Sequence, residues 1–443
     1  MPRLKVLTEQ NECSETLSVA LDRDGKRRRW QLSLVLLSGL AYTSAPSALA
    51  LFRHGRSDAI EGSTGSVQVT GFAASLVTPL MFFFIFVCAV VLVWNLGRIF
   101  KRDARPLLFV AAGLVVFFAL RYFQAGQMLA SLLILVAFSA AIWSIGLYLE
   151  DLTVLGILGV LIALLSMGMS IFTPLAWQNN VEKSLLDTSA VLAGPFSQMN
   201  VLGMTLVALF PFTGLFRKKS MTLFGGAIML VAVILSSSRS SGIAFLVGLL
   251  CTVLMLVFTT SSMRKLLFTL IAVVTMTVTI WLPFATTDPK IFTNRGAIWM
   301  GAVRYFKDSW LFGHYDVFGF RGRLINEIGS LVSHGHNLAI HYLAMTGIVG
   351  FFAILIILAP AIATCFKTLS MTAVPATALV TLLSLGMSEL PLRTDSFDGP
   401  AWATWGSLFC LAFAYRKSHS PQVLDATLQK DVNQPIKGMS VSR

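Results

Sequence analysis

The feature that most constrains this chain is a succession of apolar runs, many of them close to 20 residues long. A helix needs about 20 apolar residues to cross a hydrocarbon layer about 30 Å thick. About twelve runs meet or approach this length, near 31–52, 71–94, 106–121, 127–148, 153–175, 195–215, 220–236, 241–259, 266–284, 340–364, 371–390 and 400–415. We expect the short runs at 106–121 and 220–236 to be the weakest. The succession predicts an all-α, polytopic transmembrane helical bundle of about twelve spans.

Composition supports a membrane protein and argues against other classes. Of the 443 residues, 56% are hydrophobic and 12% charged, whereas a soluble protein carries about 25% charged residues. The net charge of +13 could indicate a nucleic-acid partner in a soluble protein. Here much of the excess lies beside the apolar runs, as the positive-inside rule expects. We therefore expect contact with membrane lipids and no nucleic acid.

The five cysteines predict neither a disulfide framework nor a metal site. Cys13 lies in the polar N-terminal segment, and the other four lie in or at the end of apolar runs. Their spacings match no metal motif, so we interpret them as small buried hydrophobes. We expect no cleaved signal peptide, because the run after Arg27-Arg28-Arg29 is long enough to remain as a span.

Basic residues recur at every second connection between the runs, and this sets the expected orientation. They are Lys26 to Arg29; Arg98, Lys101, Arg102 and Arg105; Arg217, Lys218 and Lys219; Arg264 and Lys265; Lys367; and Arg416 and Lys417. The one exception is the Glu150-Asp151 turn, which has no base. The pattern predicts that these connections and both termini are cytoplasmic, and that the number of spans is even.

The expected organisation has five parts. They are a cytoplasmic tail at 1–30, spans one to nine at 31–284, one long outer connection at 285–339, three further spans at 340–415, and a cytoplasmic tail at 416–443. The long connection combines Trp and Tyr with many charges, so we expect it to fold. Within it, Ala297 to Phe306 is amphipathic, which predicts a helix packed on the membrane.

Arg239 stands between two apolar runs, in the turn from Ser236 to Gly242 on the expected outer face. An isolated arginine at membrane depth is costly unless it is paired. One interpretation is an arginine that snorkels to the interface. The other is an anion site, because a guanidinium binds phosphate bidentately and small neighbours leave backbone N–H groups accessible.

The segment Ser333-His334-Gly335-His336-Asn337 leads into the tenth run, and four of the six histidines lie in this outer region. Three interpretations compete. A metal site would need further ligands, and no HExxH or Cys/His spacing is present. A structural histidine is the second. The third is a catalytic base, because imidazole titrates near neutral pH.

A third feature, Gly194-Pro195-Phe196-Ser197-Gln198-Met199-Asn200, opens the sixth run. Pro195 is expected in the first helical turn, where proline is permitted. Asn200 could then hydrogen-bond a substrate or a neighbouring helix.

Taken in this order, these features resemble the O-antigen ligase and polymerase superfamily of bacterial lipid-linked glycan transferases. The corresponding residues are Gly194 to Asn200, Ser238-Arg239-Ser240, Asn294 to Trp299, His336-Asn337, and Gly347-Ile348-Val349-Gly350. The resemblance covers roughly residues 190–360. Two departures affect local loop geometry: Trp310 to Tyr315 replaces a Pro-x-x-Gly-x-Gly stretch, and Met199 stands where proline is common.

The resemblance implies a GT-C-type, metal-independent, inverting glycosyltransferase in the bacterial inner membrane, with its active site in the periplasmic loop. Its donor would be an undecaprenyl-diphosphate-linked glycan. Its acceptor would be lipid A–core in a ligase, favoured here by the compact chain and late loop, or a second lipid-linked chain in a polymerase.

A sugar diphosphate is already activated, so the chemistry needs no ATP, cofactor or enzyme nucleophile. It needs a base for the acceptor hydroxyl and positive charge for the departing diphosphate. His336 is the candidate base, and Arg239 and Arg295 are the candidate diphosphate ligands. Second-rank candidates are His334, Asn337, Asn200, Arg304, Arg321, Arg323, and the last outer turn with Glu389, Pro391 and Arg393.

Two other classes give different expectations. A transporter or flippase would carry ionisable residues deep in its spans and broken helices at matching positions of two halves. The runs here are almost free of Asp, Glu, Lys and Arg, which disfavours ion-coupled transport. A structural assembly factor would leave the outer arginines and His336 replaceable.

Overall fold

The computed structural model describes residues 2–56, 67, 69–100, 102–125, 130–179, 190–314, 320, 322 and 334–415. At 2–21, 124–125 and 293 it describes only the backbone. The expected C-terminal tail at 416–443, and both Arg321 and Arg323, lie outside the described residues.

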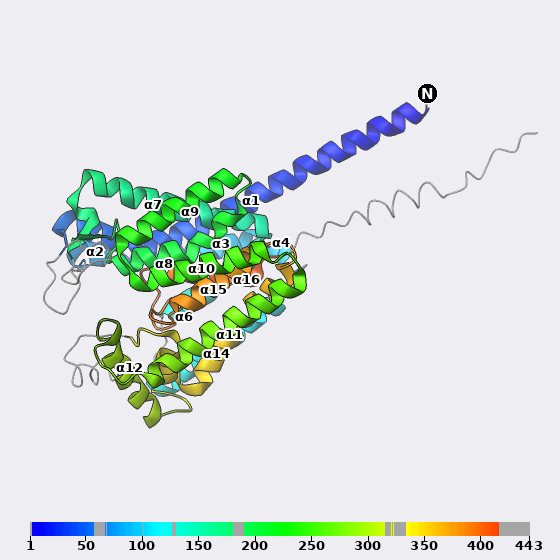
Figure 1. Ribbon diagram of the computed structural model, residues 1–443. Helices are drawn as coiled ribbons and strands as arrows, with labels where there is room; N and C mark the ends of the chain where they lie inside the picture. The colour runs from blue at the N-terminus through cyan, green and yellow to red at the C-terminus, as the bar shows by residue number, and fades with distance from the viewer. Residues whose placement is uncertain are drawn as a thin grey trace, which may run out of the picture.

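Every predicted run forms helix, which confirms the all-α polytopic fold (Figure 1). The principal helices are α1 (Pro2–His54), α2 (Gly71–Ser75), α3 (Val77–Trp94), α4 (Leu96–Ile99), α5 (Arg105–Ala125), α6 (Ala130–Ile145), α7 (Thr153–Phe172), α8 (Met199–Leu209), α9 (Lys219–Ser236), α10 (Arg239–Val257), α11 (Ser261–Ala285), α12 (Ile291–Asp308), α14 (Leu338–Thr368), α15 (Val374–Leu385) and α16 (Ala401–Phe413). Short 3-10 helices lie at η1 (Leu149–Leu152), η2 (Pro174–Ala176) and η3 (Phe210–Leu215). The strands β1 (Trp177–Asn179) and β2 (Ala190–Leu192) pair antiparallel, with Gln178 opposite Val191.

Helix length and burial divide the bundle into two classes. Eight helices of the described chain are long and apolar enough to cross a membrane, and the apolar helices at 130–145, 199–215, 374–385 and 401–413 are shorter. The expectation that 106–121 and 220–236 would be weakest was wrong, since α5 and α9 are among the eight. Every residue of α15 and α16 is buried. A helix that is apolar all round and buried all round is a core helix, so α15 and α16 form the centre of the bundle.

The first helix begins well before the expected span. Helix α1 runs without interruption from Pro2 to His54, and its membrane-compatible part is Asp22–His54. Figure 1 shows its N-terminal portion extending away from the bundle. Residue 31 therefore marks a position inside a continuous helix, and the polar segment expected as a tail is helical.

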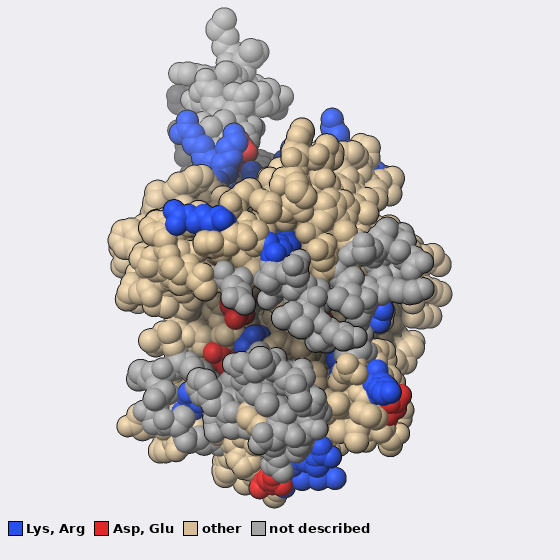
Figure 2. All heavy atoms as spheres, turned by 90° about the vertical axis from the view of Figure 1, so that its left-hand side faces the viewer, with Lys and Arg blue, Asp and Glu red and all other residues tan. Residues whose placement is uncertain are grey.

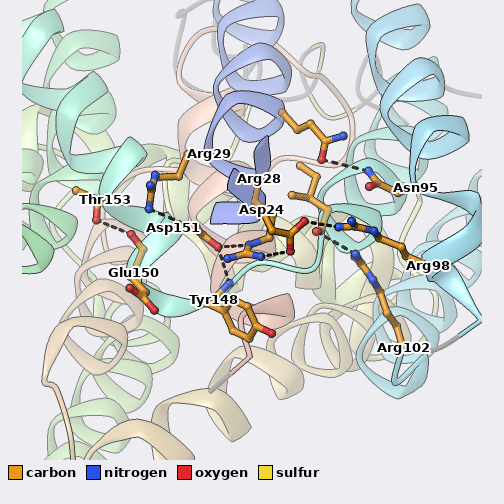
Figure 3. A network of polar contacts seen from close by, with 12 residues as sticks. Asp24, Arg28, Arg29, Asn95, Arg98, Arg102, Tyr148, Glu150, Asp151 and Thr153 are labelled. Carbon is orange, nitrogen blue, oxygen red and sulfur yellow. Dashed lines mark hydrogen bonds and ion pairs between the residues drawn. The ribbon is translucent and has the colours of Figure 1, made fainter. Parts of the chain in front are cut away.

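One end of the bundle, which we call the terminal face, is joined by a network of arginines and aspartates (Figure 3). Asp24 of α1 binds Arg98 at 2.6 Å and Arg28 at 2.7 Å. Arg28 also donates through Nε to Asp151 at 2.6 Å. Asp151 is 1% exposed. The Glu150-Asp151 connection, which lacks the basic residues of the other connections on this side, therefore supplies the negative charge that pairs with the arginines of α1.

The last described residues reach the same face. The backbone N–H of Tyr415, just after α16, donates to the Leu147 carbonyl at 2.8 Å. The described chain thus enters and leaves the bundle on the terminal face. The opposite end, which we call the loop face, carries the described residues of the connections between α7 and α8, α9 and α10, α11 and α14, and α15 and α16. Which face is cytoplasmic stays a prediction.

Helix α12 of the loop face confirms the amphipathic helix predicted at 297–306, and the turn after it enters a break in α14. Gly347 of α14 has φ +64° and ψ −166°, so the helix is interrupted there. The N–H groups of Ile348 and Val349 donate instead to the carbonyls of Trp310 and Leu311, at 2.9 and 3.1 Å. A Cβ atom at Gly347 would collide with the Leu311 backbone. The Gly347 to Gly350 motif noted in the sequence is therefore the place where the turn after α12 packs into α14.

Candidate active site

Four segments meet on the loop face around the carboxylate of Glu389. Arg295, on the first turn of α12, donates through Nη2 to Glu389 Oε1 at 2.5 Å. Its Nη1 donates to Ser240 Oγ at 2.9 Å and to the Ser388 carbonyl. Ser240 in turn donates to Glu389 Oε1 at 3.2 Å. This arrangement joins α10, α12 and the connection between α15 and α16. In Figure 2, which looks onto this face, basic and acidic side chains lie in a recess between two parts of the molecule.

Glu389 is an ionised, buried carboxylate. Its side chain is 3% exposed, and burial alone would raise its pKa. The Arg295 guanidinium and the His336 imidazole outweigh that effect, and the pKa of Glu389 falls to about 2. A fixed negative charge therefore stands at the centre of the site at any physiological pH.

His336, in the segment before α14, contacts the same carboxylate. We call Glu389, Arg295, Ser240 and His336 the cluster. The His336 Nδ1 lies 3.5 Å from Glu389 Oε2, and the His336 side chain is 25% exposed. The backbone has φ +45°, a left-handed conformation that costs a non-glycine residue about 1–2 kcal/mol. Such strain persists where the surroundings fix it, and it collects at functional sites. An imidazole that is both held against a carboxylate and partly exposed is suited to proton transfer.

Asn337 explains how that conformation is fixed. Its Oδ1 accepts the Ile340 N–H at 3.0 Å, which caps the start of α14. Its Nδ2 donates to the carbonyls of Thr279 and Met387, both at 2.9 Å. The side chain is completely buried, and both of its N–H donors are used. Asn337 therefore positions the neighbouring His336 and has no donor left for a ligand.

His334 lies beside His336, with the two ring centroids 4.0 Å apart. Burial, and then the charges of His336 and Arg393, hold the pKa of His334 well below its usual range, so it is neutral. Its Nδ1 has no hydrogen-bond partner within the described part of the chain. An unpartnered buried nitrogen is uncommon and marks this ring as a group able to receive a ligand.

The predicted arginines differ in how far their side chains are buried. Arg393 pairs with Asp395 at 2.7 Å and Asp398 at 3.8 Å. Although burial acts in the other direction, the Asp395 carboxylate holds the pKa of Arg393 above its usual range. Arg239, the first residue of α10, and Arg304 of α12 are both exposed. Arg295 is thus in the cluster, Arg393 is at its edge, and Arg239 directly precedes Ser240 of the cluster.

The Gly194 to Asn200 feature leads into α8, which packs against α10 of the cluster. Gly203 of α8 approaches α10 so closely that a Cβ there would lie 2.6 Å from Ser241 Oγ. Asn200, the second residue of α8, is half-buried. The helix begins at Met199, so Pro195 lies in the turn before it, and the expectation of Pro195 in the first helical turn was wrong. The reason is that the Gln178 side chain accepts the Met199 N–H at 2.9 Å and defines a later start.

Arg56 is a loop-face arginine that the sequence reasoning missed. It donates to the carbonyls of four residues between 2.8 and 3.0 Å, namely Leu175, Gly194, Phe196 and Ser197. Burial lowers its pKa to about 10. It therefore shapes the entry to α8. The criterion that singled out Arg239 could also have found Arg56, because both are basic residues on connections expected on the outer face.

Five helices begin on the loop face near the cluster: α8, α10, α12, α14 and α16. A helix N-terminus carries a partial positive charge. Together with Arg239 and Arg295, these ends favour an anion beside the cluster. Among the described residues, no three or more His, Cys, Asp or Glu side chains are arranged to hold a metal ion.

The fold defines a polytopic helical membrane protein, and its described residues place a cluster of Arg295, His336 and the buried Glu389 on the face opposite the ends of the described chain. Residues 224–355 match the family model described as O-Antigen ligase. The matched stretch includes Arg239, Arg295, His336 and the break at Gly347, and it confirms the resemblance drawn from the motifs. A search of curated proteins found no match.

Proposed function

We propose that the protein is an O-antigen ligase-type glycosyltransferase. It would transfer O-antigen polysaccharide from undecaprenyl diphosphate to lipid A–core at the periplasmic face of the bacterial inner membrane. The observation that carries this proposal is the contact of His336 with Glu389, whose other oxygen binds Arg295. The family match of residues 224–355 supports the reaction class.

In this proposal His336 is the general base. The Glu389 carboxylate beside Nδ1 favours the tautomer with a proton on Nδ1 and stabilises the imidazolium that forms. The Nε2 lone pair is then available to the acceptor hydroxyl. The hydroxyl oxygen attacks the anomeric carbon, its proton passes to Nε2, and the bond to the diphosphate oxygen breaks with inversion. Undecaprenyl diphosphate leaves with the bonding electron pair.

Arg239 is the proposed diphosphate ligand. Arg295 is the weaker candidate, because both of its terminal nitrogens already donate to protein groups. Its proposed role is to hold Glu389 in place and to add positive potential next to the leaving group. Charge stabilisation of this kind takes the place of a divalent cation.

The test is a transfer assay with purified protein, lipid-linked glycan and lipid A–core, run with and without a chelator. We expect donor consumption that depends on lipid A–core and survives the chelator. Chain extension without transfer to the core would show the alternative, an O-antigen or exopolysaccharide polymerase of the same superfamily. Movement of intact donor across the membrane without glycan transfer would show a lipid-linked glycan transporter.

A further inference from the structure

A second buried polar network lies behind the His334 to His336 turn. His341, in the first turns of α14, is 2% exposed. Its Nδ1 accepts the backbone N–H of Gly335 at 3.4 Å. On the other side of the ring, Nε2 lies 3.8 Å from Asp395 Oδ1. One imidazole therefore bridges the turn that carries His336 and the connection that carries Glu389.

The contacts define the tautomer of this imidazole. Because Nδ1 accepts a hydrogen bond, it carries the lone pair, and the ring proton of neutral His341 is on Nε2, facing Asp395. Asp395 is held in turn by the fork of Arg393, with Nε to Oδ1 at 3.2 Å and Nη2 to Oδ2 at 2.7 Å. Although burial acts in the other direction, the Arg393 charge holds the pKa of Asp395 below its usual range. The carboxylate is thus a fixed negative charge that the Nε2 proton faces at 3.8 Å.

The turn itself is packed tightly on His341. A Cβ atom at Gly335 would lie 3.2 Å from the His341 Cα, which is closer than most side chains tolerate. The next residue, His336, has the left-handed backbone, and Asn337 anchors the turn from its other end. The contact of Gly335 with His341 therefore fixes the turn on the N-terminal side of His336.

We propose that His341 is a positioning residue that acts on His336 through the backbone of Gly335, with the Asp395–Arg393 pair fixing the orientation of its ring. This inference rests on the proposed function, because it assigns His341 to the same transfer reaction. His341 touches no substrate; it holds the strained turn so that His336 faces Glu389.

Two substitutions test separately the contact of Nδ1 with Gly335 and the contact of Nε2 with Asp395. In His341→Asn, the side-chain oxygen can take the place of Nδ1 as acceptor for Gly335, while the contact with Asp395 is lost. In His341→Gln, the side-chain N–H₂ can take the place of Nε2 toward Asp395, while the acceptor for Gly335 is lost. We expect His341→Gln to lower kcat about tenfold, as the loss of one positioning hydrogen bond would, with an unchanged KM for the donor. We expect His341→Asn to recover most of that activity.

The comparison is made on purified protein in detergent, with the folded fraction of each variant measured by size-exclusion chromatography and transfer rates normalised to it. Equal rates for the two variants, or a faster Gln variant, would overturn the inference. Asp395→Asn is the second variant, since it keeps the imidazole and removes the negative charge that Nε2 faces. We expect it to lower kcat by a smaller factor, again at unchanged KM, and wild-type kcat would contradict the role of the Asp395–Arg393 pair.

His336→Ala in the same assay distinguishes failure of this inference from failure of the proposed function. If His336→Ala is inactive while both His341 variants match wild type, the positioning role is wrong and the proposed function stands. If His336→Ala transfers glycan at the wild-type rate, the proposed function is wrong, and the inference fails with it.

Discussion

The two faces of the molecule carry polar networks of different character. On the terminal face, Asp24 and Asp151 bind Arg98 and Arg28 from neighbouring segments, in ion pairs of 2.6–2.7 Å. On the loop face, an ion pair of 2.5 Å between Arg295 and Glu389 stands beside a histidine with a left-handed backbone. All four non-glycine residues with positive φ in the described chain lie on the loop face, at Ser237, Phe292, Asn294 and His336.

Under the proposed function, this difference separates a structural network from a catalytic one. Charge alone does not mark a functional site, because both faces have buried ion pairs. Within the described chain, non-glycine residues with positive φ and unpartnered buried imidazole nitrogens lie on the loop face, and such features need other interactions to maintain them. The terminal-face network should therefore govern stability, and the loop-face network should govern turnover.

The largest effect should come from His336→Ala. Removal of a general base lowers the rate by about 10²–10⁴-fold, and we expect a loss in that range with little change in the melting temperature. The transfer assay with lipid-linked glycan and lipid A–core measures it. His54→Ala, which changes an exposed histidine at the loop-face end of α1, is the matched control and should transfer at the wild-type rate.

Glu389→Gln should come next, with a loss of about 10²-fold in turnover, because the isosteric amide cannot stabilise the His336 imidazolium. It should also alter acid stability. The folded-state pKa of about 2 lies below the ordinary 4.5, so ionised Glu389 stabilises the fold above pH 4.5, and this contribution is lost as the pH falls toward 2.

Acid unfolding followed by tryptophan fluorescence can test this second effect. The difference in stability between wild type and Glu389→Gln should shrink as the pH is lowered from 4.5 toward 2. A constant difference over that interval would contradict the assignment of Glu389 as the ionised centre of the site.

On the terminal face, Asp151→Asn should reduce stability and spare catalysis. Asp151 is buried against Arg28, and removing one partner of a buried pair costs about 3–5 kcal/mol. Arg28 keeps Asp24, so we expect the lower end of that range, measured as a lower melting temperature in detergent. Asp103→Asn, at a half-exposed carboxylate of the same face, is the control. A loss of turnover per folded Asp151→Asn molecule would remove the distinction between the faces.

The smallest effect should come from Arg98→Ala. Arg98 and Asp24 are 45% and 35% exposed, and exposed pairs contribute about 0–1 kcal/mol. We expect a slight decrease in melting temperature that disappears in high salt, because salt screens exposed charges. A larger, salt-independent decrease would show that this pair belongs energetically to the buried network around Asp151.

The sequence predicted the parts of the fold that depend on local pattern. Apolar runs located the helices, and amphipathic spacing located α12 within the outer connection. Helix ends were less predictable, since the start of α8 at Met199 depends on Gln178 from a distant strand. The span of α1 likewise begins within a longer helix that local polarity did not indicate.

The site was predictable only in its catalytic candidates. Arg295 was singled out as an arginine of the outer connection and of the family motif, and His336 as a histidine of the same region. The structure brings both to one carboxylate. The central position of Glu389 and the role of His341 could not be predicted, because both depend on which connections meet in space. Conversely, Arg239 and Arg304 had the right residue type for the cluster, yet their side chains are exposed.

The break in α14 also has a consequence for the order in which the protein is built. The amides of Ile348 and Val349 depend on the carbonyls of Trp310 and Leu311, and an amide left unsatisfied in hydrocarbon costs several kcal/mol. The ribosome makes 309–313 before it makes α14. Before Trp310 and Leu311 dock, α14 can satisfy these amides only as an unbroken helix, so the break at Gly347 and the docking of the outer connection form in one step.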